Sequence, residues 1–262
     1  MIAFIGCGNM GHAIMKGILS KGLYTNRDII GVDKNEECLE KIKEELGIEV
    51  TTDNKSAARK ADVIVMAVKP LHYETAVKEI RDVVEDQLII SIAAGQTMER
   101  IEGMFGKKIH LVRTMPNTPA LVLEGATGMC VNPWVTEDEK KKAKDIFESF
   151  GVCKEVGEYL MDTVVGVSGS SPAYVFLFIE AMADAAVADG MPRKDAYDLA
   201  AQSVLGSAKM VLETGLHPGV LKDMVCSPGG TTMEAVRVLE EKGFRSAVIE
   251  AQKACVKKSK EL

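Results

Sequence analysis

A glycine-rich turn near the N-terminus constrains the fold of this chain more than any other feature. The apolar segment Met1–Ile5 is typical of a buried strand, and a helical pattern begins directly after the turn. In such a unit the first glycine permits a tight turn, the second lets the backbone approach a pyrophosphate, and the third allows close helix–strand packing. The helix N-terminus attracts phosphates. The motif predicts dinucleotide binding, with a ligand-free turn as the alternative, at Gly6, Cys7, Gly8, Asn9, Met10 and Gly11.

Short apolar runs alternate with helical patterns through the first half of the chain. Five further strands are expected, at Asp28–Asp33, Ile48–Thr51, Asp62–Val68, Gln87–Ala93 and Ile109–Arg113. Buried strands separated by helices are typical of a parallel sheet covered on both faces. Right-handed crossovers make such a sheet doubly wound. The expected fold class is therefore α/β, with a Rossmann-type dinucleotide-binding domain over residues 1–160.

The pattern changes near Gly125. Two strands at Thr127–Val131 and Val152–Val156, separated by a helix, are expected as additions to the sheet edge. From about Met161 the chain is nearly all helical, which predicts an all-α dimerisation and substrate domain over residues 161–262. The helix Pro172–Ala188 is apolar nearly all round, as a helix buried from several sides must be. We expect it to pack against another subunit, the alternative being a core helix within one subunit.

Composition narrows the classes of partner. The net charge of −6 gives little support to nucleic-acid binding, which requires a basic face. The six cysteines form no CxxC pair and the four histidines have no metal-ligand spacing, so we expect reduced thiols and no metal site. Met1 leads directly into a strand, which predicts no signal peptide. Because Glu180 and Asp184 interrupt the most apolar stretch, we expect a cytoplasmic protein without a membrane helix.

Asp33 at the end of the second predicted strand bears on the choice of cofactor. An acid at this place can accept hydrogen bonds from the adenosine ribose hydroxyls and would repel a 2′-phosphate. This favours NADH over NADPH, although the neighbouring Lys34 would partly offset the repulsion. The alternative is that Asp33 only caps the following helix.

Three further strand ends are expected at the same edge of the sheet. Ligands of open α/β sheets bind at the carboxyl ends of the strands, and small residues there leave room for a dinucleotide. Each of these segments taken singly would also suit a plain strand-to-helix turn. They are Ala67-Val68-Lys69-Pro70, Ala93-Ala94-Gly95 and Met115–Pro119.

Two polar, glycine-containing loops are predicted at helix starts in the second half, at Ser168–Pro172 and Ser227–Thr232. Free backbone N–H groups at a helix N-terminus form a binding site for a carboxylate. The hydroxyl groups of Thr231 and Thr232 add donors and acceptors. Helix capping without a ligand is the alternative for both loops.

The motifs together resemble those of bacterial pyrroline-5-carboxylate reductases. The resemblance runs from Phe4 almost to the C-terminus and is most specific over Val167–Ala251. It implies reduction of L-1-pyrroline-5-carboxylate to L-proline with NADPH or NADH, the last step of proline biosynthesis. It also implies a homo-oligomer built from dimers, which in this family often assemble into a decamer. The motifs are GCGNMG, AVKP, SIAAG, MPNTPA, VSGSSPAY, LKDMVCSPGGTT and EAVRVLEEKGFRSAVIEA.

The resemblance also implies roles for individual residues. The cofactor would contact the glycine turn, Asn54 and the strand ends at Ala67–Pro70 and Ala93–Gly95. The substrate carboxylate would lie on backbone amides of the second polar loop, and the Thr232 hydroxyl would hydrogen-bond the ring nitrogen. Relatives that prefer NADPH often carry Ser, Thr or Arg where this chain has Asp33-Lys34-Asn35, so membership does not settle the cofactor. The implied substrate residues are Gly229, Gly230, Thr231 and Thr232.

Two other functions fit parts of the pattern. One is an imine or ketimine reductase that acts on a different ring. The other is a non-catalytic dinucleotide sensor, which would keep the glycine turn but lose the loop Ser227–Thr232 that this chain retains. No GxSxG, HExxH or paired His–Asp arrangement is present, which suits a substrate that needs little proton transfer from the protein.

Overall fold

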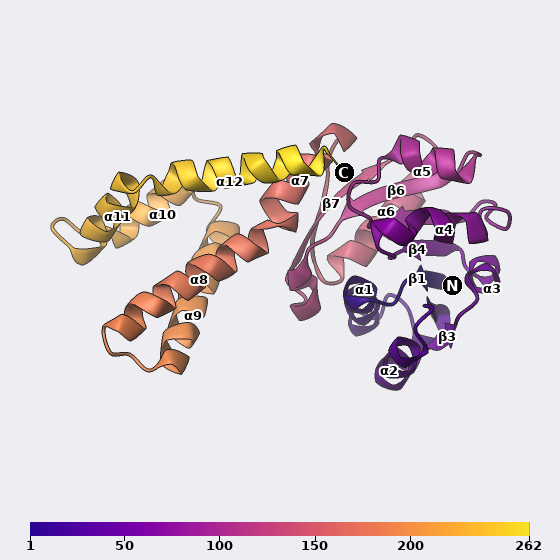
Figure 1. Cartoon of the computed structure of the whole chain (residues 1–262), viewed down its shortest axis with the longest axis horizontal. Coiled ribbons are helices and arrows are strands. Elements are labelled where there is room, and N and C mark those ends of the chain that lie inside the picture. The colour runs from indigo at the N-terminus through magenta and orange to yellow at the C-terminus, as the bar shows by residue number, and fades with distance from the viewer. Residues whose placement is uncertain (262) are drawn as a thin grey trace. The chain divides into compact units, whose positions relative to one another are not determined.

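The computed structural model describes residues 1–261, which form two compact units. The first unit comprises residues 1–170 and the C-terminal end of the chain from Cys255 onward. The second comprises Ser171–Ala254. Figure 1 colours the first from indigo to rose, with the yellow C-terminal end, and the second from orange to yellow.

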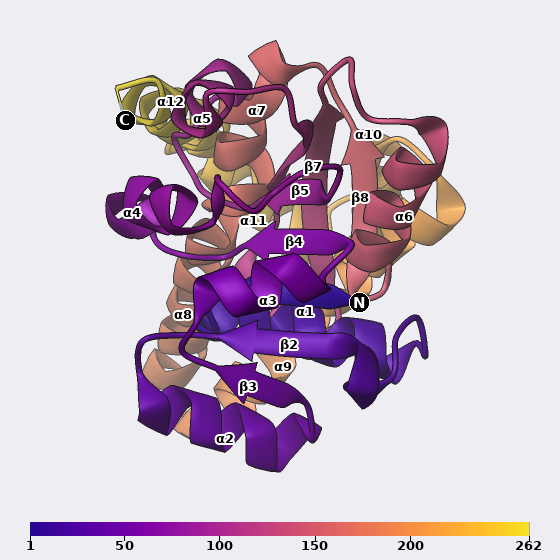
Figure 2. The same cartoon turned by 90° about the vertical axis from the view of Figure 1, so that its right-hand side faces the viewer.

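An eight-stranded sheet forms the centre of the first unit (Figure 2). Its order is β3-β2-β1-β4-β5-β6-β7-β8, in which β1 to β6 are parallel and β7 runs antiparallel to β6. The six predicted parallel strands and the two additions at the edge are confirmed, and so is the α/β fold class. The strands are β1 (Ile2–Ile5), β2 (Ile29–Val32), β3 (Glu49–Thr51), β4 (Val63–Met66), β5 (Leu88–Ser91), β6 (His110–Met115), β7 (Gly125–Val131) and β8 (Gly151–Glu155).

Two hydrophobic cores lie on the opposite faces of this sheet. Successive side chains of a strand point to opposite faces, so Ala3 and Ile5 enter one core while Ile2 and Phe4 enter the other. Tyr73 of α4 belongs to the first core, and helices α1, α2 and α6 contribute to the second. The helices of this part are α1 (Asn9–Ser20), α2 (Glu36–Leu46), α3 (Asn54–Lys60), α4 (Pro70–Ile80), α5 (Met98–Phe105) and α6 (Glu137–Glu148).

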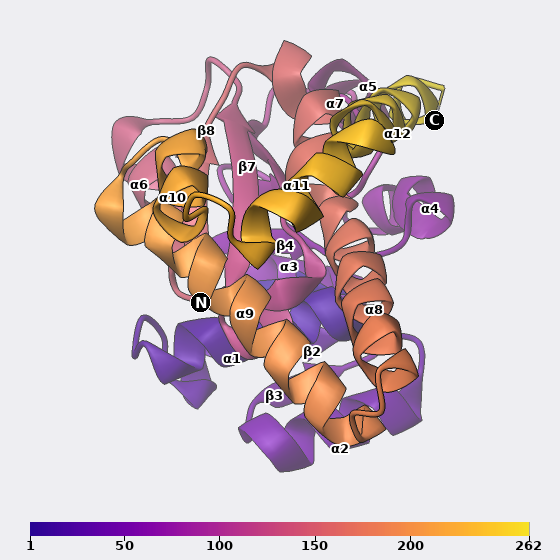
Figure 3. The ribbon, with the colours of Figure 1, turned by 90° about the vertical axis from the view of Figure 1, so that its left-hand side faces the viewer.

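The second unit is all helical, as the sequence predicted (Figure 3). Gly190 and Gly215 follow the first two helices with positive φ angles of 96° and 64°, the conformation that ends a helix at glycine. Helix α12 begins in this unit and ends in the first. The helices are α8 (Ser171–Ala188), α9 (Arg193–Thr214), α10 (Pro218–Val225), α11 (Thr231–Glu241) and α12 (Phe244–Ser259).

The prediction of a polar loop at Ser168–Pro172 is wrong. Val165–Gly169 form a π-helical turn that follows α7 (Met161–Val164) directly. Small polar residues are common in loops, but the hydroxyl of Ser168 donates to the carbonyl of Val164 at 3.0 Å, so the polar group is satisfied inside the helix.

Helix α8 leaves most of its apolar surface uncovered. Of its described residues only Ala183 is buried, whereas Phe176 and Leu177 are 63% and 67% exposed. A core helix within one subunit would bury these side chains, so that alternative is wrong for the single chain. By length and composition alone, the helical segment 158–188 would also suffice to cross a membrane.

Candidate dinucleotide and substrate sites

The glycine turn after β1 has the geometry that each of its glycines was expected to provide. Gly6 has a φ of 102°, and a Cβ there would lie 2.7 Å from the backbone of Ala67. A Cβ on Gly11 would lie 2.5 Å from the carbonyl oxygen of Gly6, so this position also requires glycine. No atom lies within 4 Å of the place that a Cβ on Gly8 would take. The turn therefore keeps open space above Gly8, at the N-terminus of α1.

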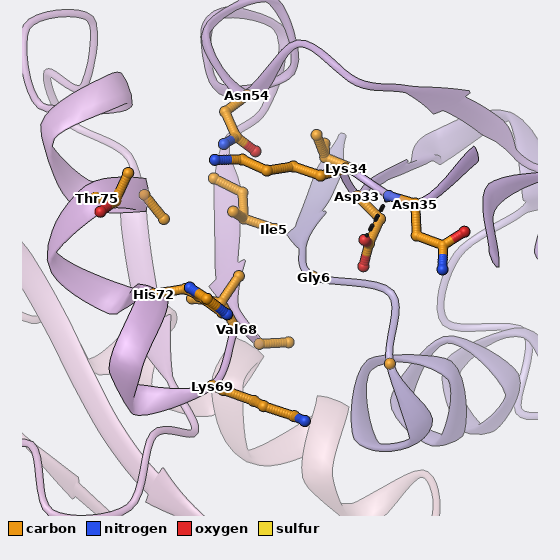
Figure 4. A pocket seen from close by; sticks show the side chains of 14 residues that line it. Ile5, Gly6, Asp33, Lys34, Asn35, Asn54, Val68, Lys69, His72 and Thr75 are labelled. Carbon is orange, nitrogen blue, oxygen red and sulfur yellow. Dashed lines mark hydrogen bonds between the residues drawn. The ribbon is translucent and has the colours of Figure 1, made fainter. Parts of the chain in front are cut away.

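A cavity of about 560 Å³ lies at the carboxyl ends of β1, β2 and β4 (Figure 4). This volume lies in the range of small-molecule and cofactor sites. Its lining brings together the predicted Gly6, Gly8, Asp33 and Asn54 with the start of the AVKP segment. The complete lining is Ile5, Gly6, Gly8, Val32, Asp33, Lys34, Asn35, Asn54, Ala67, Val68, Lys69, His72, Thr75 and Ala76.

Sequence reasoning missed the contribution of helix α4 to this cavity. His72, Thr75 and Ala76 lie on one face of the helix and line the cavity beside the predicted residues. Thr75 and Ala76 follow His72 by three and four positions, the spacing that places residues on one face of a helix, and this is the signal that would have found them. Of the described residues in the predicted cofactor set, eight do not line this cavity: Cys7, Asn9, Met10, Gly11, Pro70, Ala93, Ala94 and Gly95.

Asp33 ties the end of β2 to the glycine turn. Its Oδ2 accepts a hydrogen bond from the backbone N–H of Cys7 at 2.9 Å, and its Oδ1 accepts one from the N–H of Asn35 at 3.0 Å. Asn35, not Asp33, caps α2, because its side chain accepts from the N–H of Cys38. The capping alternative for Asp33 is therefore wrong. A carboxylate offers about four lone-pair sites, so two accepted bonds leave capacity for ribose hydroxyl groups.

The Cys7 side chain belongs to the hydrophobic core and is not suited to act as a nucleophile. Burial, followed by the nearby charge of Asp33, raises the pKa of the Cys7 thiol to about 12. The thiol therefore stays protonated at neutral pH, and a protonated thiol is a poor nucleophile. Its Sγ lies 3.5 Å from the carbonyl oxygen of Val32, which it meets as a weak donor.

The segment Met115–Pro119 at the end of β6 is held by hydrogen bonds to two other parts of the first unit. The side chain of Asn117 donates to the carbonyl of Ser168 at 3.0 Å, and its Oδ1 accepts from the N–H of Ala126 at 2.8 Å. Asn117 thus connects the sheet edge with the π-helical turn. At the neighbouring strand end, Ala93 is buried and Gly95 has a φ of 71°.

In the second unit, the loop Ser227–Thr232 ends at an uncapped helix. Gly229 has a φ of 69°, and the N–H of Gly230 donates to the carbonyl of Ser227 at 3.0 Å. Gly230 is the N-cap of α11, and within the described part of the chain no side chain caps this helix start. A Cβ on Gly230 would lie 2.5 Å from the Ser227 hydroxyl oxygen and 3.1 Å from the Ser227 carbonyl oxygen, so the turn is close at this position. The alternative that this loop only caps the helix through a side chain is therefore wrong. The first backbone N–H groups of α11 remain free to bind an anion.

Comparison with known proteins covers both units. A family model described as pyrroline-5-carboxylate reductase dimerisation matches residues 158–262, and one described as NADP oxidoreductase, coenzyme F420-dependent, matches residues 1–95. The chain is 51% identical to pyrroline-5-carboxylate reductase of Escherichia coli K12, over 100% of this chain and 97% of that protein. It is 45% identical to that of Methanosarcina acetivorans, with the same coverage.

Two solved structures superpose on this chain over nearly its full length. A pyrroline-5-carboxylate reductase from Coxiella burnetii superposes with a TM-score of 0.94 at 40% identity, covering 99% of this chain and 97% of that one. Pyrroline carboxylate reductase from Plasmodium falciparum with NADP bound superposes at 0.90 and 35% identity, with the same coverage. The dimerisation match includes the exposed apolar helix α8 and shows that the protein is a homo-oligomer. The chain belongs to the pyrroline-5-carboxylate reductases, oxidoreductases that reduce L-1-pyrroline-5-carboxylate to L-proline with NADPH or NADH in the last step of proline biosynthesis.

Proposed function

We propose that the cavity at the carboxyl ends of β1, β2 and β4 holds the nicotinamide dinucleotide. The open space above Gly8 and the N-terminus of α1 suit a pyrophosphate, and the Asp33 carboxylate suits the adenosine ribose. The cofactor, when bound, supplies a hydride to the imine carbon. The proposed cofactor residues are Gly6, Cys7, Gly8, Asn9, Met10, Gly11, Asp33, Asn54, Ala67, Val68, Lys69, Pro70, Ala93, Ala94 and Gly95.

The substrate is proposed to bind through its carboxylate at the start of α11. The uncapped N–H groups of the first turn and the positive end of the helix dipole both favour an anion there. The half-buried Thr232 lies in that first turn, and its hydroxyl is proposed to hydrogen-bond the ring nitrogen. The proposed substrate residues are Gly229, Gly230, Thr231 and Thr232.

The proposed catalytic contribution is orientation more than proton transfer. The substrate is a cyclic imine, whose protonated form is already a good hydride acceptor. Holding two reactants in the right geometry can supply roughly 7–11 kcal/mol of a barrier. The glycine–threonine loop fixes the carboxylate, and Thr232 steadies the nitrogen as it becomes an amine.

The observation that carries this assignment is the uncapped, glycine-bounded start of α11 in a chain whose relatives match over their full length. The test is a steady-state assay with pyrroline-5-carboxylate in parallel reactions with NADH and NADPH. Proline formation in either reaction is the expected result. No turnover with either, while cofactor binding is intact, would favour an imine reductase for another ring or a sensor, and a panel of five- and six-membered cyclic imines separates these two.

A dimer is proposed as the building block, with residues 1–160 as the dinucleotide domain and residues 161–262 as the dimerisation and substrate domain. The exposed apolar side chains of α8 support burial against a second copy rather than against lipid, because this helix lies inside the matched dimerisation region. We further propose assembly of dimers into a decamer and a cytoplasmic location, with no nucleic acid or membrane as partner. Light scattering on the purified protein gives the mass of the assembly and tests the dimer and the decamer.

A further inference from the structure

Glu79 on helix α4 holds two polar groups of the nucleotide cavity without lining the cavity itself. The side-chain nitrogen of Asn54 donates to Glu79 Oε2 at 2.5 Å. The ammonium group of Lys34 lies 3.4 Å from Glu79 Oε1. Figure 4 shows the nitrogen ends of Lys34 and Asn54 close together at one side of the cavity, with the Asp33 carboxylate turned away from them.

The bond to Glu79 decides which end of the Asn54 amide faces the cavity. Asn54 is buried, and its amide has a donor end and an acceptor end. Because the donor end points to Glu79, the carbonyl oxygen is left for a ligand. A ribose hydroxyl can donate to that oxygen, whereas an ionised phosphate offers only acceptors and would be repelled.

Glu79 also pairs with the cation that a 2′-phosphate would require, in a contact in which the Lys34 side chain is 76% exposed. Lys34 follows Asp33 directly and lines the cavity. Anchoring of a phosphate depends on charge-assisted hydrogen bonds from such a cation. While its ammonium pairs with Glu79, the net charge of the pair is zero and Lys34 is drawn toward α4.

We infer that Glu79 is a specificity-determining positioning residue that biases the cavity toward a ribose diol and against a 2′-phosphate. The inference rests on the proposed placement of the cofactor. It extends the bias expected from Asp33 to a residue far away in the sequence. A ribose diol is then favoured over a 2′-phosphate by three features together: the Asp33 carboxylate, the Asn54 carbonyl and the Lys34–Glu79 pair.

The test is Glu79→Gln in the full-length enzyme. Glutamine keeps the shape, removes the charge, and can donate to the Asn54 carbonyl, so that the amide of Asn54 turns its NH₂ group to the cavity. Lys34 is released at the same time. The ratio of kcat/KM for NADPH to that for NADH should rise about tenfold, the scale of one charge-assisted hydrogen bond, through KM for the cofactor with kcat nearly unchanged.

A binding measurement without turnover gives the second readout. Calorimetry should show tighter binding of 2′,5′-ADP relative to 5′-AMP in Glu79→Gln, and the gain should shrink as the salt concentration is raised. Adding Lys34→Met to Glu79→Gln should remove most of the gain. Glu74→Gln is the matched control, since Glu74 lies on the same helix, is exposed, and pairs with Lys78 at 2.6 Å.

The outcomes separate the inference from the proposed function. Unchanged cofactor and nucleotide ratios in Glu79→Gln would overturn the inference, as would an equal shift in Glu74→Gln, which would indicate a general charge effect. If the wild-type enzyme fails to reduce pyrroline-5-carboxylate with either cofactor, the proposed function fails. The 2′,5′-ADP and 5′-AMP affinities still decide the role of Glu79 in that case.

Discussion

The carboxylate of Asp33 and the backbone N–H of Cys7 are joined by a hydrogen bond of 2.9 Å. This bond fixes the end of β2 against the glycine turn that follows β1, and it holds the negative charge of Asp33 beside the cavity. One residue thus stabilises the turn and is proposed to disfavour a 2′-phosphate. Substitution of Asp33 should therefore change both the stability of the turn and the cofactor preference.

Asp33→Ser should relax discrimination against NADPH. Serine removes the negative charge and keeps a short polar side chain, so the kcat/KM ratio of NADPH to NADH should rise about tenfold. Loss of the bond to Cys7 should also lower the free energy of unfolding by about 1–2 kcal/mol. Asp82→Ser, an exposed change on the same unit, is the control and should leave the ratio unchanged. An unaltered ratio in Asp33→Ser would show that Asp33 does not select the cofactor.

Gly8→Ala and Gly6→Ala should fail in different ways. An alanine Cβ at Gly8 meets no protein atom within 4 Å, so Tm should hold while cofactor affinity falls, because the methyl group takes the space proposed for the pyrophosphate. At Gly6 the φ of 102° and the nearby Ala67 backbone should cost at least about 1–2 kcal/mol of stability.

Thermal unfolding and cofactor titration by fluorescence together distinguish the two variants. Gly103→Ala, in the open interior of α5, is the control, and it should leave cofactor affinity unchanged. Full cofactor affinity in Gly8→Ala would place the pyrophosphate elsewhere.

The sheet was predictable because its information is local. The central strands β1, β2, β4 and β5 are short runs that are buried on both faces and bounded by turn residues, and the two cores on either side of β1 follow from strict alternation. The glycine turn was predictable for the same reason, since its spacing carries its geometry. The predicted and observed strands differ only at their ends, by a few residues.

The contacts between distant segments were not predictable from local pattern. Glu79 meets Asn54 and Lys34 only because α4, α3 and the end of β2 converge at one edge of the sheet. The π-helical turn at Val165–Gly169 was missed for a different reason. Its serines and glycine are typical of a loop, and a hydroxyl-to-carbonyl bond inside the helix leaves no trace in composition.

Thr232→Ala should lower kcat/KM for pyrroline-5-carboxylate by about 10- to 100-fold, the value of a hydrogen bond to a charged partner. Cofactor Kd should not change, because Thr232 lies in the first turn of α11 and not in the cofactor cavity. Thr232→Ser retains the hydroxyl and should restore most of the activity. Retention of full kcat/KM in Thr232→Ala would rule out the proposed contact with the ring nitrogen.

Leu177→Lys should reduce the mass of the assembly while the first unit stays folded. Leu177 is 67% exposed on α8 in the single chain, and a buried, unpaired lysine in a subunit interface would be costly. Leu71→Lys is the matched control, since Leu71 is 85% exposed on α4, outside the dimerisation match. Light scattering and cofactor binding measure the two properties. An assembly of unchanged mass in Leu177→Lys would place α8 outside the interface.

The stability of the protein should fall at alkaline pH through its buried thiols. Burial raises the pKa of Cys7 from 9.0 to about 12, so the folded state holds this proton more tightly than the unfolded chain does. The stabilising effect is therefore complete below pH 9 and is lost as the pH rises toward 12. Cys130 and Cys153 have pKa values raised to about 12 by burial and act in the same direction.

Cys7→Ala should accordingly flatten, but not abolish, the decline in the free energy of unfolding between pH 8 and about 10.5, measured by urea titration at each pH. The remaining slope belongs to the other groups whose pKa values are raised by burial, which are Cys38, Cys130, Cys153, Tyr24 and Tyr73, and to surface groups common to both proteins. Cys226→Ala, at a half-buried position before α11, is the control for removal of a thiol as such. Equal slopes for wild type and Cys7→Ala would mean that the Cys7 thiol titrates alike in the folded and unfolded chain, and that its burial beside Asp33 does not suppress the thiolate.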